Sequence, residues 1–250
     1  MIISFTCARF ANRLIPASYC FMRSSAVAIA FGQLLLISSS ASGQNDFVPD
    51  STGARAPAVA LIVPVGIAIS AIADPEVREW TLKRQTRSLD RIAKVVNPLG
   101  TSRVLIPAMA ATYATALVTH QQPLVEETLR TAAGYLVADL LESALKPLVG
   151  RERPHVEGNS HRFHPFTARG DWHSFPSAHV THITAIARGI SMQTSSTPLT
   201  VFCGTLVTLV GMDRVYEDQH WTSDVAASIA ISSMVSGATI SWIERRYKQH

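Results

Sequence analysis

The sequence predicts an all-α protein, a bundle of about six to seven helices, and two observations support this fold class. Apolar residues make up 47% of the 250 residues and charged residues only 16%, below the roughly 25% of a typical soluble domain. Apolar and amphipathic runs with helical spacing follow one another, and no stretch alternates as a half-buried strand does. Some of these helices must be buried on every side or in contact with lipid.

The first 43 residues form a secretory signal pattern, with three arginines and no acid before an apolar run at 26–37. Cleavage after the small residues that follow this run would begin the mature chain at about Gln44; an uncleaved membrane anchor is the alternative. Residues 44–55 are polar and are predicted to form a linker. Residues 56–250 are then one predicted domain, which is long enough for a single core.

Removal of the signal segment changes the formal net charge from +4 to +1, because three arginines and no acid are lost. A nearly neutral chain is a poor candidate for nucleic-acid binding. Cys7 and Cys20 lie in the segment, so Cys203 alone would remain. The mature chain is therefore expected to have no internal disulfide and no cysteine-based zinc site.

Three helices are predicted before the polar motifs. The uncharged apolar run 56–73 ends at the breaker 74–75, and residues 77–96 are amphipathic and basic. The Pro- and Gly-containing stretch 97–100 stops that helix, and a second uncharged run covers 104–118.

Four further helices are predicted in the second half of the chain. Residues 126–146 have apolar residues at helical spacing but are interrupted by charges, which favours an amphipathic core helix over a lipid-facing span. Residues 155–175 read as an irregular loop rich in glycine, histidine and aromatic residues. The helices 177–192, 199–212 and 221–243 follow.

Two arrangements relative to a membrane are compatible with these runs. If 56–73 and 104–118 both cross, the basic segment between them is cytoplasmic, and residues from His120 to at least Arg214 face the periplasm. The alternative is a soluble periplasmic bundle, because both runs are shorter than the ~20 residues of an untilted span. The cations of the basic segment are Lys83, Arg84, Arg87, Arg91, Lys94 and Arg103.

The first cluster of polar residues ends the predicted helix 126–146. Lys146 is its last residue, and Arg153-Pro154 follows after a proline and a glycine that stop the helix. Two cations that leave a helix end together are suited to an anionic ligand. The alternative is ordinary capping, since basic residues interact favourably with the C-terminal end of a helix dipole.

The second cluster, Phe175-Pro176-Ser177-Ala178-His179, is predicted to be a turn that opens a helix. The first amide groups of a helix point outward unpaired, and with the Ser177 hydroxyl they form an anion cradle beside His179. An N-cap serine next to a bystander histidine is the alternative.

The third cluster contains Arg214, His220 and Asp224. If the chain is helical from His220, Asp224 lies four residues along the same face and accepts a hydrogen bond from one imidazole nitrogen. Such a bond fixes the tautomer and aims the other nitrogen outward, as an imidazole nucleophile requires. A structural His-Asp pair is the alternative.

Together the three clusters resemble the type 2 phosphatidic acid phosphatase (PAP2) and vanadium haloperoxidase superfamily, in its bacterial envelope phosphatase branch. The family signatures are Lys-x6-Arg-Pro, Pro-Ser-Gly-His and Ser-Arg-x5-His-x3-Asp, and the chain has them in this order at 146–154, 176–179 and 213–224. Two positions depart from the pattern: Ala178 replaces a glycine and Asp213 replaces a serine. The resemblance implies a helix bundle with the active site at one end.

The resemblance also implies a mechanism. His220 attacks phosphorus, Asp224 orients it, and His179 protonates the departing alkoxide and later activates water. No metal or other cofactor is needed, and vanadate is expected to inhibit as a phosphate mimic. The groups implied in phosphate binding are Lys146, Arg153, Ser177, Ala178 and Arg214.

The expected substrates are phosphate monoesters or pyrophosphates, with lipids favoured by the apolar helices, at an inner-membrane site that faces the periplasm. Three alternatives are a soluble broad-specificity periplasmic acid phosphatase, a vanadium-dependent haloperoxidase and a non-catalytic phosphate-binding membrane protein. The histidines of the 155–175 loop have no zinc-protease spacing and are expected to be solvated near the active-site mouth, with incidental metal affinity as the alternative. They are His155, His161, His164 and His173.

Overall fold

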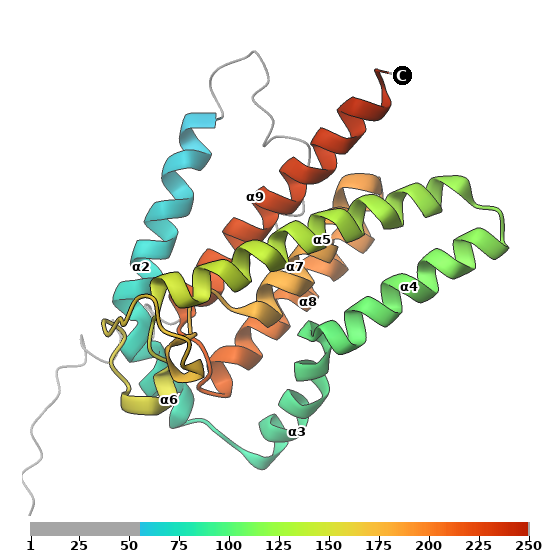
Figure 1. Ribbon diagram of the computed structural model, residues 1–250. Coiled ribbons are helices and arrows are strands. Elements are labelled where there is room, and N and C mark those ends of the chain that lie inside the picture. The colour runs from blue at the N-terminus through green and yellow to red at the C-terminus, as the bar shows by residue number, and fades with distance from the viewer. Residues whose placement is uncertain (1–55, 250) are drawn as a thin grey trace, which may run out of the picture.

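The computed structural model describes residues 56–249. Within this range the chain forms α-helices, 3₁₀ turns and loops, with no strand beyond one isolated bridge, so the all-α prediction is confirmed. The predicted signal segment 1–43 and linker 44–55 lie outside the described residues. Figure 1 shows the arrangement. The elements are α2 Ala56–Leu82, α3 Arg87–Val96, η1 Asn97–Gly100, α4 Ser102–Val118, α5 Gln122–Val149, α6 Pro154–Glu157, η2 Gly170–Trp172, α7 Ala178–Gln193, α8 Thr197–Tyr216 and α9 Thr222–Tyr247.

The predicted helix break at 74–75 is wrong, because α2 continues through Pro75 to Leu82. Proline removes one backbone hydrogen bond inside a helix. Here Asp74, just before it, is 1% exposed and bound by Arg151 and Ser223, and these contacts hold the helix in place through the proline. The predicted helix 77–96 is therefore divided between the end of α2 and α3. The described residues contain eight α-helices because α6 adds a single turn in the predicted loop.

The centre of the bundle is formed by α5, α7 and α9, which pack against one another along much of their lengths (Figure 1). α7 is buried almost throughout. Close approach of the helices depends on small residues: a Cβ added at Gly189 of α7 would lie 2.5 Å from Thr131 Oγ1 and 2.9 Å from Thr131 Cβ. The core helix predicted at 126–146 is confirmed as α5 but is longer at both ends.

One end of the bundle collects the polar clusters. α5 ends there at Gly150, which has a left-handed φ of 58°, and α7 and α9 begin there. η1 packs against the same end, because a Cβ at Gly100 would lie 2.7 Å from the Cβ of His179. The three polar clusters therefore lie together at one end of the bundle.

The basic segment between α2 and α4 lies at this same end. Thr86 donates its amide hydrogen to Tyr216 Oη at 3.2 Å, and Asn97 donates to Glu217 Oε2 at 3.0 Å. The expectation that this segment and the polar clusters face opposite sides is therefore wrong. The two lie at the same end because α5 runs along the bundle and returns the chain to that end (Figure 1), whereas the sequence predicts a core helix there and no crossing of the membrane.

We expect Gly189→Val to destabilise the bundle, because its side chain would overlap Thr131 at the contact between α5 and α7. The free energy of unfolding should fall by about 1–3 kcal/mol, as for other overpacked cores. Thermal denaturation of the detergent-solubilised full chain measures this change. Gly170→Ala is the control, since no heavy atom lies within 4 Å of its added Cβ; equal melting temperatures for the two variants would contradict the packing argument.

Candidate active site

His220 lies between α8 and α9 and is 4% exposed. Its Nδ1 is 2.6 Å from the carbonyl oxygen of Ser174. A carbonyl oxygen can only accept, so Nδ1 carries the proton and Nε2 keeps its lone pair. Burial lowers the pKa of His220 well below its usual value, and Lys146 and Arg153 lower it further. His220 is thus a neutral imidazole with Nε2 available as a nucleophile.

The predicted hydrogen bond between His220 and Asp224 is not the one the structure contains. α9 begins at Thr222, so His220 precedes the helix and the four-residue spacing does not bring the two side chains together. Asp224 Oδ2 instead accepts from Trp221 N at 3.0 Å and from Ser174 Oγ at 2.6 Å. Asp224 therefore positions His220 through Ser174, whose carbonyl oxygen accepts a hydrogen bond from the imidazole Nδ1–H.

Sequence reasoning did not identify Arg151, which is 6% exposed and holds Asp224 in place. Its Nη1 is 2.5 Å from Asp224 Oδ1, and its Nη2 is 2.8 Å from Asp74 Oδ2. Ser223 completes this buried network by donating its hydroxyl to Asp74 Oδ2 at 2.5 Å. Arg151 stands inside the first cluster, which is a signal that could have identified it. Asp74 has no such signal, because it lies far away in the sequence.

Lys146 projects from the last turn of α5 into this end of the bundle. Its Nζ is 2.7 Å from Glu142 Oε1 and donates to the carbonyl oxygen of Pro176 at 2.9 Å. Burial lowers the pKa of Lys146, and Glu142 opposes that effect. The lysine therefore links α5 to the turn that opens α7.

Two arginines accompany Lys146, in different surroundings. Arg153 donates from Nη1 to Gln219 Oε1 at 2.8 Å and from Nε to the carbonyl oxygen of Gly170 at 3.1 Å, both neutral acceptors. Burial lowers the pKa of Arg153, and the nearby Arg214 lowers it further.

Arg214 is instead held by two carboxylates. Its Nη2 is 2.5 Å from Asp213 Oδ2 and 2.6 Å from Glu217 Oε2, and its Nε is 3.0 Å from Asp213 Oδ2. Asp213, where the family pattern has serine, thus neutralises a cation of the candidate phosphate site.

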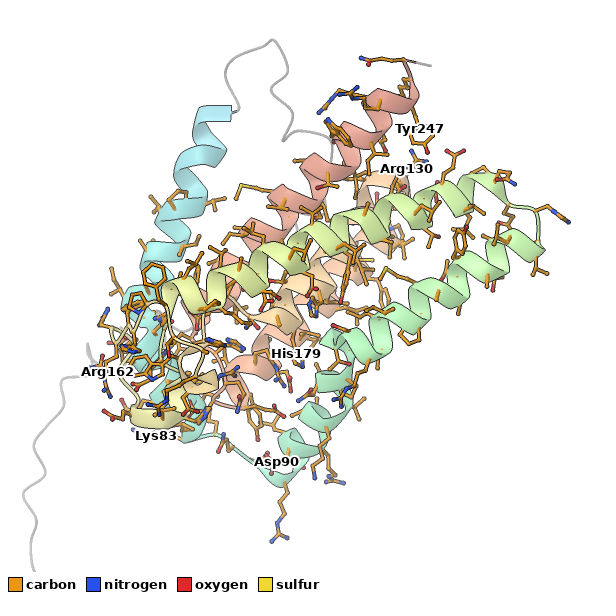
Figure 2. All side chains as sticks on the ribbon, in the orientation of Figure 1. Lys83, Asp90, Arg130, Arg162, His179 and Tyr247 are labelled. Carbon is orange, nitrogen blue, oxygen red and sulfur yellow. The ribbon has the colours of Figure 1, made fainter. Side chains whose placement is uncertain are left out.

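His179 lies in the first turn of α7 and is labelled in Figure 2 at the junction of the helices. Its pKa is lowered to about 4, chiefly by burial and then by Arg214, His182, Lys146 and Arg153. Three of these cations also lower the pKa of His220. Lys146, Arg153 and Arg214 thus act electrostatically on both imidazoles.

Ser177 and Ala178 form the start of α7. The Ser177 amide donates to Ser228 Oγ at 2.7 Å, so it is not available to a ligand. The Ser177 hydroxyl oxygen is buried and has no hydrogen-bond partner in the part of the chain that the structure describes. Ala178 is half-buried and contributes one of the first amides of the helix. A hydroxyl and free amides at a helix N-terminus can bind an anion.

Two of the four loop histidines lie within hydrogen-bond distance of backbone carbonyl oxygens. His155 Nδ1 is 3.1 Å from the carbonyl oxygen of Asp218, and His173 Nε2 is 2.9 Å from that of Thr167. Elsewhere, oxygen and nitrogen atoms of Asp139, Glu142 and His182 lie within 4.8 Å of one another. These atoms already have protein partners, since His182 Nε2 is 2.6 Å from Asp139 Oδ1 and Glu142 pairs with Lys146.

Comparison with known proteins agrees with this geometry. The model of the PAP2 superfamily matches residues 127–248, which contain all three clusters. No curated protein sequence matches the chain. A solved transmembrane PAP2-type phosphatidylglycerolphosphate phosphatase from Bacillus subtilis is similar in fold, with a TM-score of 0.57 and 19% identity over 73% of this chain and 94% of that one. The region that carries the three clusters thus matches the PAP2 superfamily, and this match together with the fold supports a phosphoric monoester hydrolase.

Proposed function

We propose that this protein hydrolyses phosphate monoesters or pyrophosphates of lipids through a phospho-histidine intermediate, without a metal or other cofactor. One observation carries the proposal: a buried neutral imidazole, His220, keeps a free Nε2 beside three cations. A neutral nitrogen nucleophile is needed for attack on phosphorus, and the cations stabilise the charge on the transferred group.

The proposed reaction has two steps. His220 Nε2 forms a bond to phosphorus as the bond to the leaving alkoxide breaks. His179, whose protonation is favoured once the anionic phosphate is bound, gives its proton to that alkoxide. Neutral His179 then takes a proton from water, whose oxygen attacks phosphorus and releases His220. Lys146, Arg153 and Arg214 hold the phosphoryl oxygens, with the Ser177 hydroxyl and the first amides of α7. Vanadate, which has the same oxyanion shape, is expected to inhibit.

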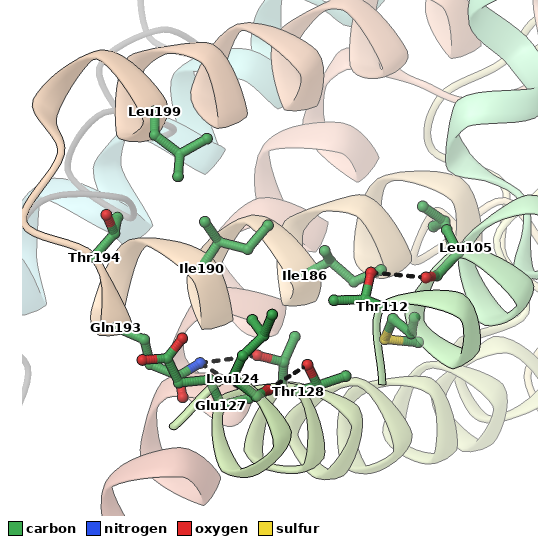
Figure 3. Close-up of a pocket in the computed structure, with 13 residues that line it drawn as sticks. Leu105, Thr112, Leu124, Glu127, Thr128, Ile186, Ile190, Gln193, Thr194 and Leu199 are labelled. Atoms are coloured by element: carbon green, nitrogen blue, oxygen red, sulfur yellow. Dashed lines mark hydrogen bonds between the residues drawn. The ribbon is translucent and has the colours of Figure 1, made fainter. Parts of the chain in front are cut away.

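The surroundings of the site favour a lipid. In the described residues, α8 and α9 are long and apolar enough to cross a membrane. A mostly apolar cavity of about 490 Å³ lies between α4, α5, α7 and α8 (Figure 3). It includes Leu105, one turn beyond Ser102, whose Oγ is 3.3 Å from His182 Nδ1. We propose that the protein lies in the bacterial inner membrane; the periplasm-facing active site, predicted from two spans at 56–73 and 104–118, stays a prediction.

We expect His220→Ala to lose phosphate release by ~10³-fold or more, because no other described group replaces the nucleophile. Release from phosphatidate, a polyprenyl pyrophosphate and p-nitrophenyl phosphate is measured in EDTA. The control is His161→Ala, in the exposed loop. Wild-type activity that disappears in EDTA would contradict the metal-free mechanism, and a preference for p-nitrophenyl phosphate would favour a broad-specificity acid phosphatase.

We expect His179 to titrate near pH 4 in the free protein and to be neutral at pH 7. Arg214→Gln should raise this pKa toward 6.5, because the Arg214 guanidinium is the charged group that opposes protonation of His179 most strongly. Bound vanadate should also raise it, since an anion favours the imidazolium. NMR of histidine-labelled protein, assigned with His179→Gln, follows the titration. A midpoint near 6.5 in the free wild type would show that neither burial nor the cations lower the pKa of His179.

We expect Asp213→Asn and Asp213→Ser to bind vanadate more tightly, by about fivefold, because Arg214 would be released from one of its two carboxylates. The asparagine variant keeps an acceptor for the guanidinium and removes only the charge. Inhibition constants are compared with those of Glu157→Gln, an exposed acid away from the site. Weaker vanadate binding in both Asp213 variants would mean that the carboxylate is needed to hold Arg214 in place.

A further inference from the structure

α3 packs against the bundle by a narrow strip of its surface. Only Ala93 and Val96 of its ten residues are buried. Three larger apolar side chains point away from the protein: Leu89 is 40% exposed, Ile92 55% and Val95 70%. Apolar side chains gathered on one exposed face of a helix mark a surface suited to contact with a membrane or a partner.

The remaining face of α3 is basic. Arg87, Arg91 and Lys94 are all exposed, and Arg84 and Arg103 lie exposed on either side of the helix in the sequence. The acid of α3, Asp90, accepts a hydrogen bond from Tyr216 Oη at 2.6 Å, on the side of the helix that meets α8. Because successive residues turn by about 100°, Arg91 lies next to Val95 around the helix, so apolar and cationic side chains share one border.

The exposed face of α3 lies beside the C-terminal end of α8, which is a candidate membrane span. Tyr216 is the last residue of α8, one of the two helices able to cross a membrane. Its carbonyl oxygen accepts from Gln85 Nε2 at 2.9 Å, and its hydroxyl contacts Thr86 and Asp90. In Figure 2 the labelled Asp90 marks α3 at the edge of the molecule, away from the central helices.

We propose that α3 is an interfacial helix that inserts Leu89, Ile92 and Val95 into a bilayer surface and binds anionic lipid headgroups through Arg87, Arg91 and Lys94. An amphipathic helix with basic residues on its polar face is suited to this environment, and each basic residue near an anionic surface adds about 1 kcal/mol of attraction. A bilayer is favoured over a protein partner because α3 lies beside the end of a candidate span.

This surface lies next to the candidate active site. Asn97, which follows α3 directly, donates to Glu217, and Glu217 in turn binds Arg214. Anionic headgroups gathered by α3 would therefore be concentrated at the entrance to the phosphate-binding residues. Membrane binding by α3 is measured without turnover, so its test does not depend on the proposed hydrolysis.

The test uses the full chain in nanodiscs, with Cys7, Cys20 and Cys203 replaced by serine and a polarity-sensitive dye on Val95→Cys. Discs of phosphatidylcholine are compared with discs that also contain phosphatidylglycerol. We expect blue-shifted emission and quenching by spin-labelled lipid in the anionic discs, and much less of both in the neutral discs. Dye on Ala168→Cys, in an exposed loop, should report water in both.

Charge variants make the test specific to α3. Replacing Arg87, Arg91 and Lys94 with glutamine should reduce the lipid-immersed population in anionic discs by ~10-fold or more. The matched control replaces Arg245, Arg246 and Lys248, at the far end of α9, with glutamine and should leave that population unchanged. Emission from Val95→Cys that is aqueous in both discs would overturn the proposal. Emission that is equally blue-shifted in both discs and in detergent would overturn it in favour of a protein contact.

Discussion

The buried ion network around Arg151 is the constraint on which the active site depends. Arg151 joins Asp74 of α2 to Asp224 of α9, and both carboxylates are almost inaccessible to water. Removing one member of a buried ion pair typically costs about 3–5 kcal/mol, because the partner stays buried and uncompensated. The network therefore fixes the relative position of two helices, and it anchors α2 at Asp74, directly before Pro75.

The same network determines how His220 is oriented. Ser174 donates its hydroxyl to Asp224 at 2.6 Å, and its amide donates to the carbonyl oxygen of Arg151 at 3.0 Å. Because the hydroxyl and the amide of Ser174 are both fixed, its carbonyl oxygen has one direction in which to accept the hydrogen bond from the imidazole Nδ1–H. The carboxylate thus orients the nucleophile through a backbone group. Burial and the nearby cations, not this contact, lower the pKa of His220, and no carboxylate bonds directly to the imidazole to raise it strongly.

The sequence predicted the helical class and the three clusters because each depends on local spacing. Apolar periodicity identified α5, α7, α8 and α9, and the spacing of His220 from Arg214 is set within a few turns of chain. What could not be predicted depends on tertiary contacts. α2 continues through Pro75 beside the contact of Asp74 with Arg151, which is distant in the sequence, and the partner of Asp224 is decided by where α9 begins. That α3 and the polar clusters share one end of the bundle follows from the full length of α5, which returns the chain to that end.

The cations of the site differ in how they are neutralised before any phosphate arrives. Lys146 is paired with Glu142, and Arg214 with two carboxylates, whereas Arg153 contacts neutral acceptors. Paired cations can be buried at lower cost than isolated ones, but the carboxylates compete with an incoming phosphate for the same donors. Arg153 therefore offers the least neutralised charge to the substrate. Tight binding of phosphate would also retain the product, so the carboxylates beside Lys146 and Arg214 favour its release over its retention.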